Sequence, residues 1–285
     1  MCDKDIHPGL VEDWSLSRRS FVAAGVAATF ATSAMAAENV VEKDVTVKTA
    51  DGSADAALFY PAGKGSWPAV LVWPDILGLR PVFRDLGKRL AAQGYVVLVP
   101  NPFYRFKKAP VIEGPFDFNN PADRAKIGPI RQGMSDAGTD KDATAFLAFL
   151  DAQPQTNKKK KAGVQGYCMG GPLSFRTAAA VPNRIGAVGS FHGGGLVTQT
   201  PASPHLLIPK TNAAYLVAVA QNDDEQDPKA KEVLKQAFAS AKRTATVEVY
   251  PAAHGWCVPG SQAYNQAAAE RAWAELLRMY KARLA

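Results

Sequence analysis

One cysteine of this chain stands where a catalytic nucleophile would be expected, in the turn Gly166-Tyr167-Cys168-Met169-Gly170. An apolar run typical of a strand, Ala162–Gln165, ends just before the turn, and a helical stretch, Met169–Ala180, follows it. A strand, a tight glycine turn and a helix form the pattern of a nucleophile elbow, here with Cys in place of Ser. The helix N-terminus favours the thiolate, which is the nucleophilic form. The spacing predicts Cys168 as a nucleophile, and a small buried Cys in a glycine-rich turn is the alternative.

Such a nucleophile needs a base and an acid that orients the base, and candidates for both lie downstream. Asp223 and Asp224 follow the apolar run Ala214–Ala220, and His254 follows the alternating run Thr246–Tyr250. The order nucleophile, acid, histidine is that of α/β-hydrolases, and ligand sites of open α/β sheets lie just beyond strand ends. We therefore expect His254 to be the base, with Asp223 as its acid because it is nearer the strand end than Asp224.

Other titratable side chains compete for these roles. His192 also ends a predicted strand, but it precedes the acid, so we interpret it as a pocket wall or a neutral histidine. Asp227 is expected to cap a helix that begins at Pro228. Asp224 and Glu225 are interpreted as loop charges.

Short apolar or β-branched runs alternate with stretches of helical periodicity, which is the order of βαβ units. This order predicts an α/β fold with a mostly parallel sheet of about eight strands and helices on both faces. We find no internal repeat and expect residues 37–285 to form a single domain. The predicted strands are Ala56–Tyr60, Ala69–Trp73, Val96–Pro100, Ala162–Gln165, Ile185–Phe191, Ala214–Ala220 and Thr246–Tyr250.

The predicted helices carry apolar faces suited to packing on a sheet. The segment from Phe103 to Gly133 breaks the alternation with several Pro and Gly residues, and long segments of this kind are typical of lids or substrate walls. We expect it to flank the active site. The apolar faces are Phe83, Leu86 and Leu90; Ala143, Phe146, Leu147 and Leu150; Val233, Leu234, Ala237, Phe238 and Ala241; and Ala269, Trp273, Leu276 and Tyr280.

The composition is that of an ordinary globular protein. The 285 residues are 47% hydrophobic and 21% charged, which excludes collagen-like, coiled-coil and wholly disordered classes. Three cysteines are too few for a disulfide framework. The net charge of +7 is spread along the chain, with a dense run only at Lys158–Lys161, so we expect no nucleic-acid partner. The histidines and cysteines lack the spacing of metal ligands, and we expect no metal and no cofactor.

The N-terminal segment, residues 1–36, has the features of an export signal. Ser17-Arg18-Arg19-Ser20-Phe21 precedes an uncharged, Ala-rich stretch that ends in Ala34-Met35-Ala36. Adjacent arginines, a weakly apolar stretch and a small-x-small cleavage site resemble a twin-arginine signal peptide. The stretch is shorter than the ~20 apolar residues that span a bilayer, so an uncleaved anchor is the weaker alternative. We predict cleavage after Ala36 and a periplasmic mature protein without a stable membrane anchor.

Over nearly all of residues 40–285 the chain resembles the dienelactone hydrolase family. The resemblance rests on the cysteine turn, on Tyr250 to Trp256 around the histidine, and on Trp73-Pro74-Asp75-Ile76-Leu77-Gly78-Leu79. It implies an α/β-hydrolase fold with a Cys168-Asp223-His254 triad. It also implies an oxyanion hole made by the backbone N–H groups of Ile76 and Met169.

The resemblance has further implications for the thiol and the substrate. Asp75 stands where the family carries a glutamate that holds the resting thiol; it is one methylene shorter, and a plain loop carboxylate is the alternative. The family's substrate-binding arginine after the histidine is replaced by Cys257-Val258, and Arg124 and Arg131 lie in the segment where another could come from. The expected pocket walls are Phe103, Tyr104, Phe116, His192 and Trp256.

The hypothesis that follows is hydrolysis of a small-molecule ester or lactone through a thioester on Cys168. Two other classes stay open: a periplasmic small-molecule binding protein, and a thiol redox sensor that uses Cys168 with Cys257. The complete triad favours hydrolysis, because a binding protein has no need of all three groups. The sequence determines neither the acyl and leaving groups nor the oligomeric state.

Overall fold

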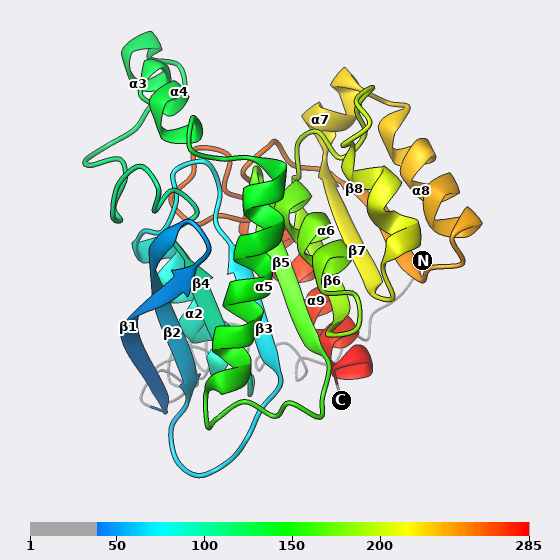
Figure 1. Cartoon of the computed structure of the whole chain (residues 1–285). Coiled ribbons are helices and arrows are strands. Elements are labelled where there is room, and N and C mark those ends of the chain that lie inside the picture. Colours follow the sequence, from blue (N-terminus) through cyan, green and yellow to red (C-terminus); the bar gives the residue numbers. More distant parts are fainter. Residues whose placement is uncertain (1–38, 285) are drawn as a thin grey trace, which may run out of the picture. The chain divides into compact units, whose positions relative to one another are not determined.

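The computed structural model describes residues 39–284, built around one eight-stranded sheet (Figure 1). The strands are β1 (Val40–Thr49), β2 (Gly52–Pro61), β3 (Ala69–Trp73), β4 (Val96–Pro100), β5 (Ala162–Tyr167), β6 (Ile185–Phe191), β7 (Ala214–Ala220) and β8 (Ala245–Tyr250). Their order in the sheet is β1-β2-β4-β3-β5-β6-β7-β8. β2 pairs antiparallel with β1 and β4, and the remaining pairs are parallel. The predicted α/β class and mostly parallel sheet are confirmed. The predicted export signal lies outside the described residues.

Helices pack on both faces of the sheet, as predicted. α2 (Pro81–Ala91) and α9 (Gln266–Arg283) share one apolar cluster, while α5 (Asp136–Ala152), α6 (Gly170–Ala180) and α8 (Ala230–Ser240) share the other. Shorter helices complete the described part: α3 (Pro121–Ala125), α4 (Ile127–Arg131), α7 (Gln221–Gln226) and the 3-10 helix η1 (Pro204–Lys210). Within residues 39–284, no helix combines the length and apolarity needed to cross a membrane.

The central strands are apolar throughout because both of their faces are covered. In β3, Val70 and Val72 join the cluster under α2 and α9, whereas Leu71 and Trp73 join the cluster under α5 and α6. All five residues of β3 and of β4 are buried. Continuous apolar runs are what parallel strands between two helix layers require, so the runs found in the sequence become the middle of the sheet.

The sheet begins with a strand that the sequence did not indicate. β1 pairs along its length with β2, but most of its side chains are exposed or half-buried, and Glu42, Asp44 and Lys48 interrupt its apolar pattern. It is an edge strand, and an edge strand contributes little to the core. The segment from Phe103 to Gly133 is also more ordered than expected, because α3 and α4 form within it and extend away from the sheet (Figure 1).

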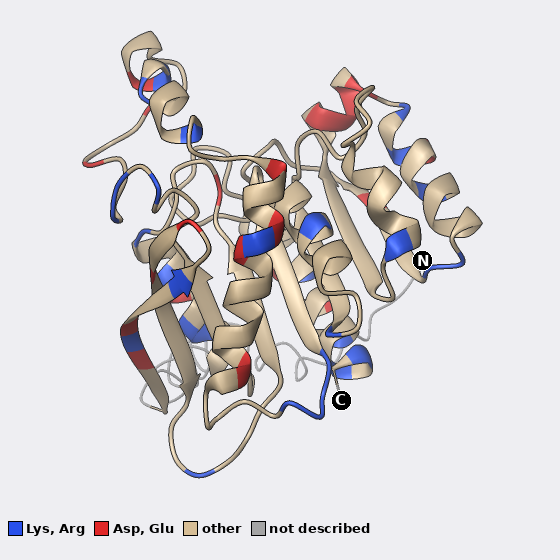
Figure 2. Ribbon diagram, in the orientation of Figure 1, with Lys and Arg blue, Asp and Glu red and all other residues tan. Residues whose placement is uncertain are grey.

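The start of α8 differs from the prediction. Asp227 was expected to cap a helix at Pro228, but α8 begins at Ala230 with Lys229 as its N-cap residue. Asp227 instead closes α7, where its N–H donates to the carbonyl of Asp223. The acids taken as loop charges lie on α7, which stands out as an acidic helix in Figure 2. Asp224 there pairs with Lys231 of α8 at 2.6 Å, joining the two helices.

A nearly buried ion-pair cluster fixes the start of the segment between β4 and α3. Arg105 donates to both carboxylate oxygens of Asp142 on α5, at 2.7 and 2.9 Å, and to Asp51 in the β1–β2 turn. The Tyr104 hydroxyl donates to Asp142 at 2.8 Å. Asp142 is 3% exposed, so its charge is matched by a neighbouring arginine, as buried charges must be. The cluster thus connects β1, β2 and α5 to the start of the segment between β4 and α3.

Candidate active site

The turn that carries Cys168 is a strained elbow between β5 and α6. Cys168 has φ of +53°, a left-handed conformation that non-glycine residues rarely adopt. The backbones on either side touch: a Cβ on Gly166 would lie 1.8 Å from the carbonyl oxygen of Gly170, and one on Gly170 would lie 2.4 Å from that of Trp73. Only glycine fits at these two positions. The elbow therefore holds the cysteine at the N-terminus of α6, beside the end of β3.

His254 and Asp223 meet at the same edge of the sheet, beyond the ends of β8 and β7. The Nδ1 atom of His254 lies 2.7 Å from Oδ2 of Asp223. The Asn222 side chain accepts a hydrogen bond of 2.7 Å from the His254 backbone N–H and so fixes the loop that carries the histidine. The sequence reasoning missed Asn222, although its position next to the acid was a signal. The ring of His254 interacts in turn with Cys168.

The charge of His254 is set by these two partners. Burial alone would lower its pKa, but the hydrogen bonds to Asp223 and Cys168 and the charges of both raise the pKa to about 10. At neutral pH the imidazole is therefore a cation between a carboxylate and a sulfur.

Cys168 and His254 line a cavity of about 790 Å³. Of the residues predicted for the site, Asp75, Ile76, Phe116, Cys168, His192 and His254 line it. Asp223 lies behind His254, joined to it through Nδ1. The apolar walls come from three segments far apart in sequence and include Leu77, Val82, Ile112, Phe116, Phe118 and Val258.

Three expected pocket walls lie elsewhere. Tyr104 points into the Arg105–Asp142 cluster, because its hydroxyl is bound there. Trp256 is fully buried and stacks on Tyr250 at a centroid distance of 4.7 Å. Phe103 is 1% exposed and packs beneath the cavity in the cluster that contains Ile76. The prediction that these aromatic residues line the cavity was wrong, since each has a partner in the interior.

Two backbone N–H groups follow the ends of β3 and β5. Those of Ile76 and Met169 make no hydrogen bond to other atoms of residues 39–284. Ile76 follows β3 and Met169 follows the cysteine, and the close approach of Gly170 to Trp73 brings these two segments together. The family resemblance implies an oxyanion hole made by these two groups, and that role stays a prediction.

Asp75 is held by Arg80 at the wall of the cavity. Its two carboxylate oxygens accept hydrogen bonds of 2.6 and 2.8 Å from the two terminal nitrogens of the guanidinium group, and one also accepts from the Leu77 N–H at 3.0 Å. The guanidinium lies over the Phe83 ring, 4.9 Å from its centroid. The resemblance implies that the Asp75 carboxylate holds the thiol, but in the structure this carboxylate is bound to Arg80. Sequence reasoning missed Arg80, although it directly follows the loop from Trp73 to Leu79.

His192 lies beside His254. Its ring centroid is 4.7 Å from that of His254, in an edge-on arrangement. Burial, and then the positive charge of His254, hold the pKa of His192 well below its usual range. Neither ring nitrogen has a hydrogen-bond partner within the described residues. His192 is therefore a neutral histidine at the cavity wall, next to a charged one.

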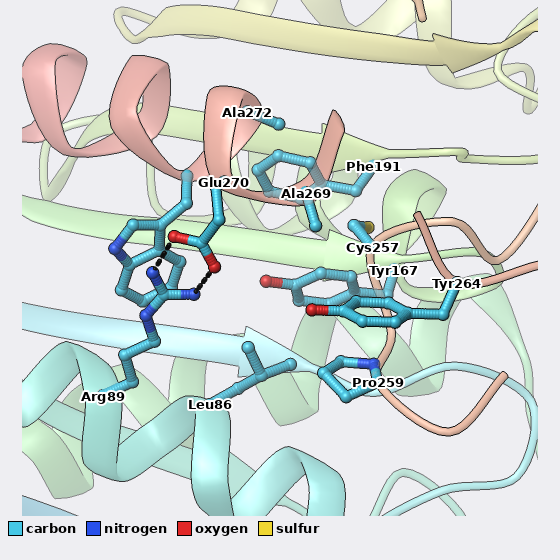
Figure 3. Close-up of a pocket in the computed structure, with 11 residues that line it drawn as sticks. Leu86, Arg89, Tyr167, Phe191, Cys257, Pro259, Tyr264, Ala269, Glu270 and Ala272 are labelled. Carbon is cyan, nitrogen blue, oxygen red and sulfur yellow. Dashed lines mark hydrogen bonds and ion pairs between the residues drawn. The ribbon is translucent and has the colours of Figure 1, made fainter. Parts of the chain in front are cut away.

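Cys257 occupies a separate, smaller hollow of about 30 Å³. Figure 3 shows it in this hollow with Tyr167 and the Arg89–Glu270 ion pair, between α2 and α9. Burial raises the pKa of the Cys257 thiol well above its usual range, which makes the thiol unreactive. The two described cysteines are not bonded to each other.

The comparison with known families agrees with this geometry. A model of the dienelactone hydrolase family matches residues 54–284, from β2 to the end of α9. The chain belongs to the dienelactone hydrolase family. The resemblance found from the cysteine turn and the histidine loop is therefore confirmed at the level of the family. In the part of this family member that the structure describes, no group of three or more His, Cys, Asp or Glu side chains could hold a metal ion.

Curated relatives and solved structures are similar over most of the chain. It is 28% identical over 222 residues to carboxymethylenebutenolidase 1 of Cupriavidus pinatubonensis, covering 76% of this chain and 88% of the relative. It is 27% identical over 221 residues to carboxymethylenebutenolidase of Rhodococcus opacus, covering 76% and 82%.

Two solved structures show the same fold. A dienelactone hydrolase-like promiscuous phosphotriesterase from metagenomic libraries superposes with a TM-score of 0.70 at 21% identity, covering 87% of this chain and all of that one. A dienelactone hydrolase from Anabaena variabilis superposes with a TM-score of 0.60 at 17% identity and the same coverage. The α/β-hydrolase fold of this dienelactone hydrolase family member is thus established.

The elbow geometry predicts a large effect for one glycine substitution and almost none for another. Gly170→Ala should lower the free energy of unfolding by about 3 kcal/mol, because its Cβ would overlap the carbonyl oxygen of Trp73. Gly194→Ala, whose Cβ would meet nothing within 4 Å, should change it by less than about 0.5 kcal/mol. Urea unfolding followed by circular dichroism measures both; equal stabilities would contradict the close packing of the elbow.

The partners of His254 predict its titration. In heteronuclear NMR the imidazole should stay protonated through neutral pH, and Asp223→Asn should lower its pKa. Because the folded-state pKa lies above the unfolded value of about 6.5, the stability it contributes is full below that value and is lost as pH rises through about 10. Asp223→Asn should therefore destabilise the protein most at mildly acidic pH, below about 6.5 but above the range in which carboxylates take up protons. Asp224→Asn, which breaks only the pair with Lys231, should leave the His254 titration in place; a wild-type His254 titrating near its ordinary value would refute the assignment.

Proposed function

We propose that this protein is a cysteine hydrolase of carboxylic esters or lactones, with Cys168 as nucleophile, His254 as acid and base, and Asp223 as the orienting acid. The observation that carries the proposal is the position of the histidine. His254 is bound to Asp223 at 2.7 Å and interacts with Cys168, at the base of a cavity large enough for a small molecule. The names of the two curated relatives, both carboxymethylenebutenolidases, support this class of reaction.

The proposed reaction begins with attack of the Cys168 sulfur on the substrate carbonyl. The proton that the thiol gives up is held by His254, whose pKa of about 10 keeps it there at neutral pH. The developing oxyanion accepts hydrogen bonds from the N–H groups of Ile76 and Met169, and two such donors lower the barrier by several kcal/mol. Collapse of the tetrahedral intermediate breaks the carbon–oxygen bond and leaves a thioester, while His254 gives its proton to the alkoxide that departs.

Hydrolysis of the thioester completes the cycle. His254, now neutral, takes a proton from a water molecule, and the resulting hydroxide attacks the thioester carbonyl. The second tetrahedral intermediate releases the carboxylic acid and returns the sulfur as a thiolate beside the histidine cation. Asp223 keeps the Nδ1 atom of His254 occupied throughout, so that the other ring nitrogen remains directed toward the reacting atoms.

Two variants test the nucleophile. Cys168→Ala should lower kcat for short-chain aryl esters and simple lactones by about 10³-fold or more, since no thioester can form. Cys257→Ala removes the other described cysteine, outside the catalytic cavity, and should retain activity. Release of the alcohol is followed by absorbance, and mass spectrometry of the quenched wild-type enzyme should show the acylated peptide that contains Cys168. Wild-type rates in Cys168→Ala would refute the proposal.

A redox function finds little support, because Cys257 is a buried thiol in a separate hollow.

We further propose that residues 1–36 are a twin-arginine-type signal peptide and that the mature enzyme acts in the periplasm. The adjacent arginines and the Ala34-Met35-Ala36 site support this placement. In a bacterial host, the wild-type chain should appear in the periplasmic fraction with Ala37 as its first residue. Replacing both arginines, Arg18→Lys with Arg19→Lys, should leave the full-length chain in the cytoplasm. A periplasmic double variant would contradict the twin-arginine route.

A further inference from the structure

We propose that the active site selects esters with an uncharged, apolar acyl group, and that the Asp75–Arg80 ion pair excludes acyl groups that carry a carboxylate. The inference rests on the proposed hydrolase function and names the substrate class of the same site. It starts from the charges that line the cavity.

Arg80 is the sole arginine or lysine among the described residues that line the cavity, and its charge is already matched. Its two terminal nitrogens bind the two carboxylate oxygens of Asp75, at 2.6 and 2.8 Å, and one nitrogen also donates to the carbonyl of Gly78. The side chains of Arg80 and Asp75 are only 23% and 13% exposed. A bidentate pair shielded in this way leaves little charge to attract a second carboxylate.

The other arginines considered for substrate binding do not reach the cavity. Arg124 lies on α3, where its guanidinium donates to the carbonyl of Phe118 at 3.0 Å, and Arg131 lies exposed on α4. Neither lines the cavity. Val258, which lies beyond the catalytic histidine in the stretch where the family resemblance implies an arginine, is apolar and does line it. Arg124 and Arg131 therefore lie outside the cavity, and Val258 is apolar, so none of these three positions offers a cation to an acidic substrate.

The remaining charges of the site disfavour an anionic acyl group. Asp75 contributes a carboxylate to the wall, and the charge of the His254 cation is balanced by Asp223 and the cysteine sulfur. A substrate carboxylate would lose its hydration on entering and would meet no unmatched cation. Juxtaposed like charges suppress binding of the wrong ligand.

The cavity walls carry apolar side chains against which an apolar acyl group can pack. Leu77 and Val82 line one side, Val258 another, and the segment between β4 and α3 adds Ile112, Phe116 and Phe118. The rings of Phe116 and Phe118 contact each other at 4.8 Å between centroids, and Phe118 is 51% exposed. An alkyl or aryl group in the cavity would cover this exposed ring, which is favourable in proportion to the apolar area removed from water.

Two isosteric substrates test the inference. The mono-4-nitrophenyl ester of adipic acid and 4-nitrophenyl 6-methylheptanoate differ only at the far end of the acyl chain, where an isopropyl group replaces the carboxylate. The wild-type enzyme should have a kcat/KM at least about tenfold higher for the neutral ester. Equal values, or a preference for the acid, would overturn the inference while leaving the hydrolase function intact. Turnover of neither ester would count against both.

The ion pair is tested by variants in which the ratio of the two kcat/KM values is the readout. Asp75→Asn keeps an oxygen for the Leu77 N–H but removes the charge that holds Arg80, so the ratio should shift toward the acidic ester by at least about tenfold. In the double variant, Asp75→Asn with Arg80→Gln, the shift of the ratio toward the acidic ester should be absent, because the guanidinium group that Asp75→Asn sets free has been removed. Asp151→Asn breaks an ion pair of similar exposure with Arg184, outside the cavity, and should leave the ratio at the wild-type value. An unchanged ratio in Asp75→Asn would refute the role of the pair.

Discussion

Contact between backbones at the cysteine turn is the constraint on which the site depends. Gly166 and Gly170 approach so closely that neither could carry a side chain, and Gly170 rests against the end of β3. This contact forces Cys168 into a left-handed conformation at the start of α6. It also places the loop after β3 beside the turn, so the segments that carry the N–H groups of Ile76 and Met169 lie next to each other.

The site contains two sets of charged side chains, and within each set the positive and negative charges are matched. The His254 cation lies between Asp223 and the cysteine sulfur, and the Asp75–Arg80 pair closes on itself at the wall. His192 remains neutral because it is buried next to a cation. The proposed reaction, which moves one proton between a sulfur and an imidazole, needs this balance, because an unmatched charge nearby would shift the position of the proton.

The surrounding fold holds these groups from many directions. The ends of β5, β7 and β8 carry Cys168, Asp223 and His254, while the segment between β4 and α3 supplies aromatic walls. That segment begins at Arg105, which is tied to Asp142 on α5 and to Asp51 in the β1–β2 turn. The edge strand β1 thus contributes to the site without lining it, since its turn helps to anchor one wall of the cavity.

Local patterns in the sequence were sufficient for the middle of the sheet and for the assignment of the family. The apolar runs of β3 and β4 and the glycine spacing around Cys168 are short-range signals, because burial on both faces and a tight turn each leave a mark on neighbouring residues. The order of Cys168, Asp223 and His254 then pointed to residues that the structure brings together: Cys168 and His254 line one cavity, and Asp223 is bound to His254.

Only the tertiary structure decided where the remaining side chains point. Tyr104 and Trp256 find partners in the interior, Asp227 closes α7 rather than opening α8, and Asp75 is bound by Arg80. β1 is likewise defined by its pairing with β2 and not by its own pattern. In each case the outcome depends on a hydrogen bond, ion pair or ring contact that competes with the role read from the sequence. The sequence by itself thus determined the fold class, the family and the triad candidates, because their signals are local, while the shape and charge of the cavity depend on which groups the fold brings into contact.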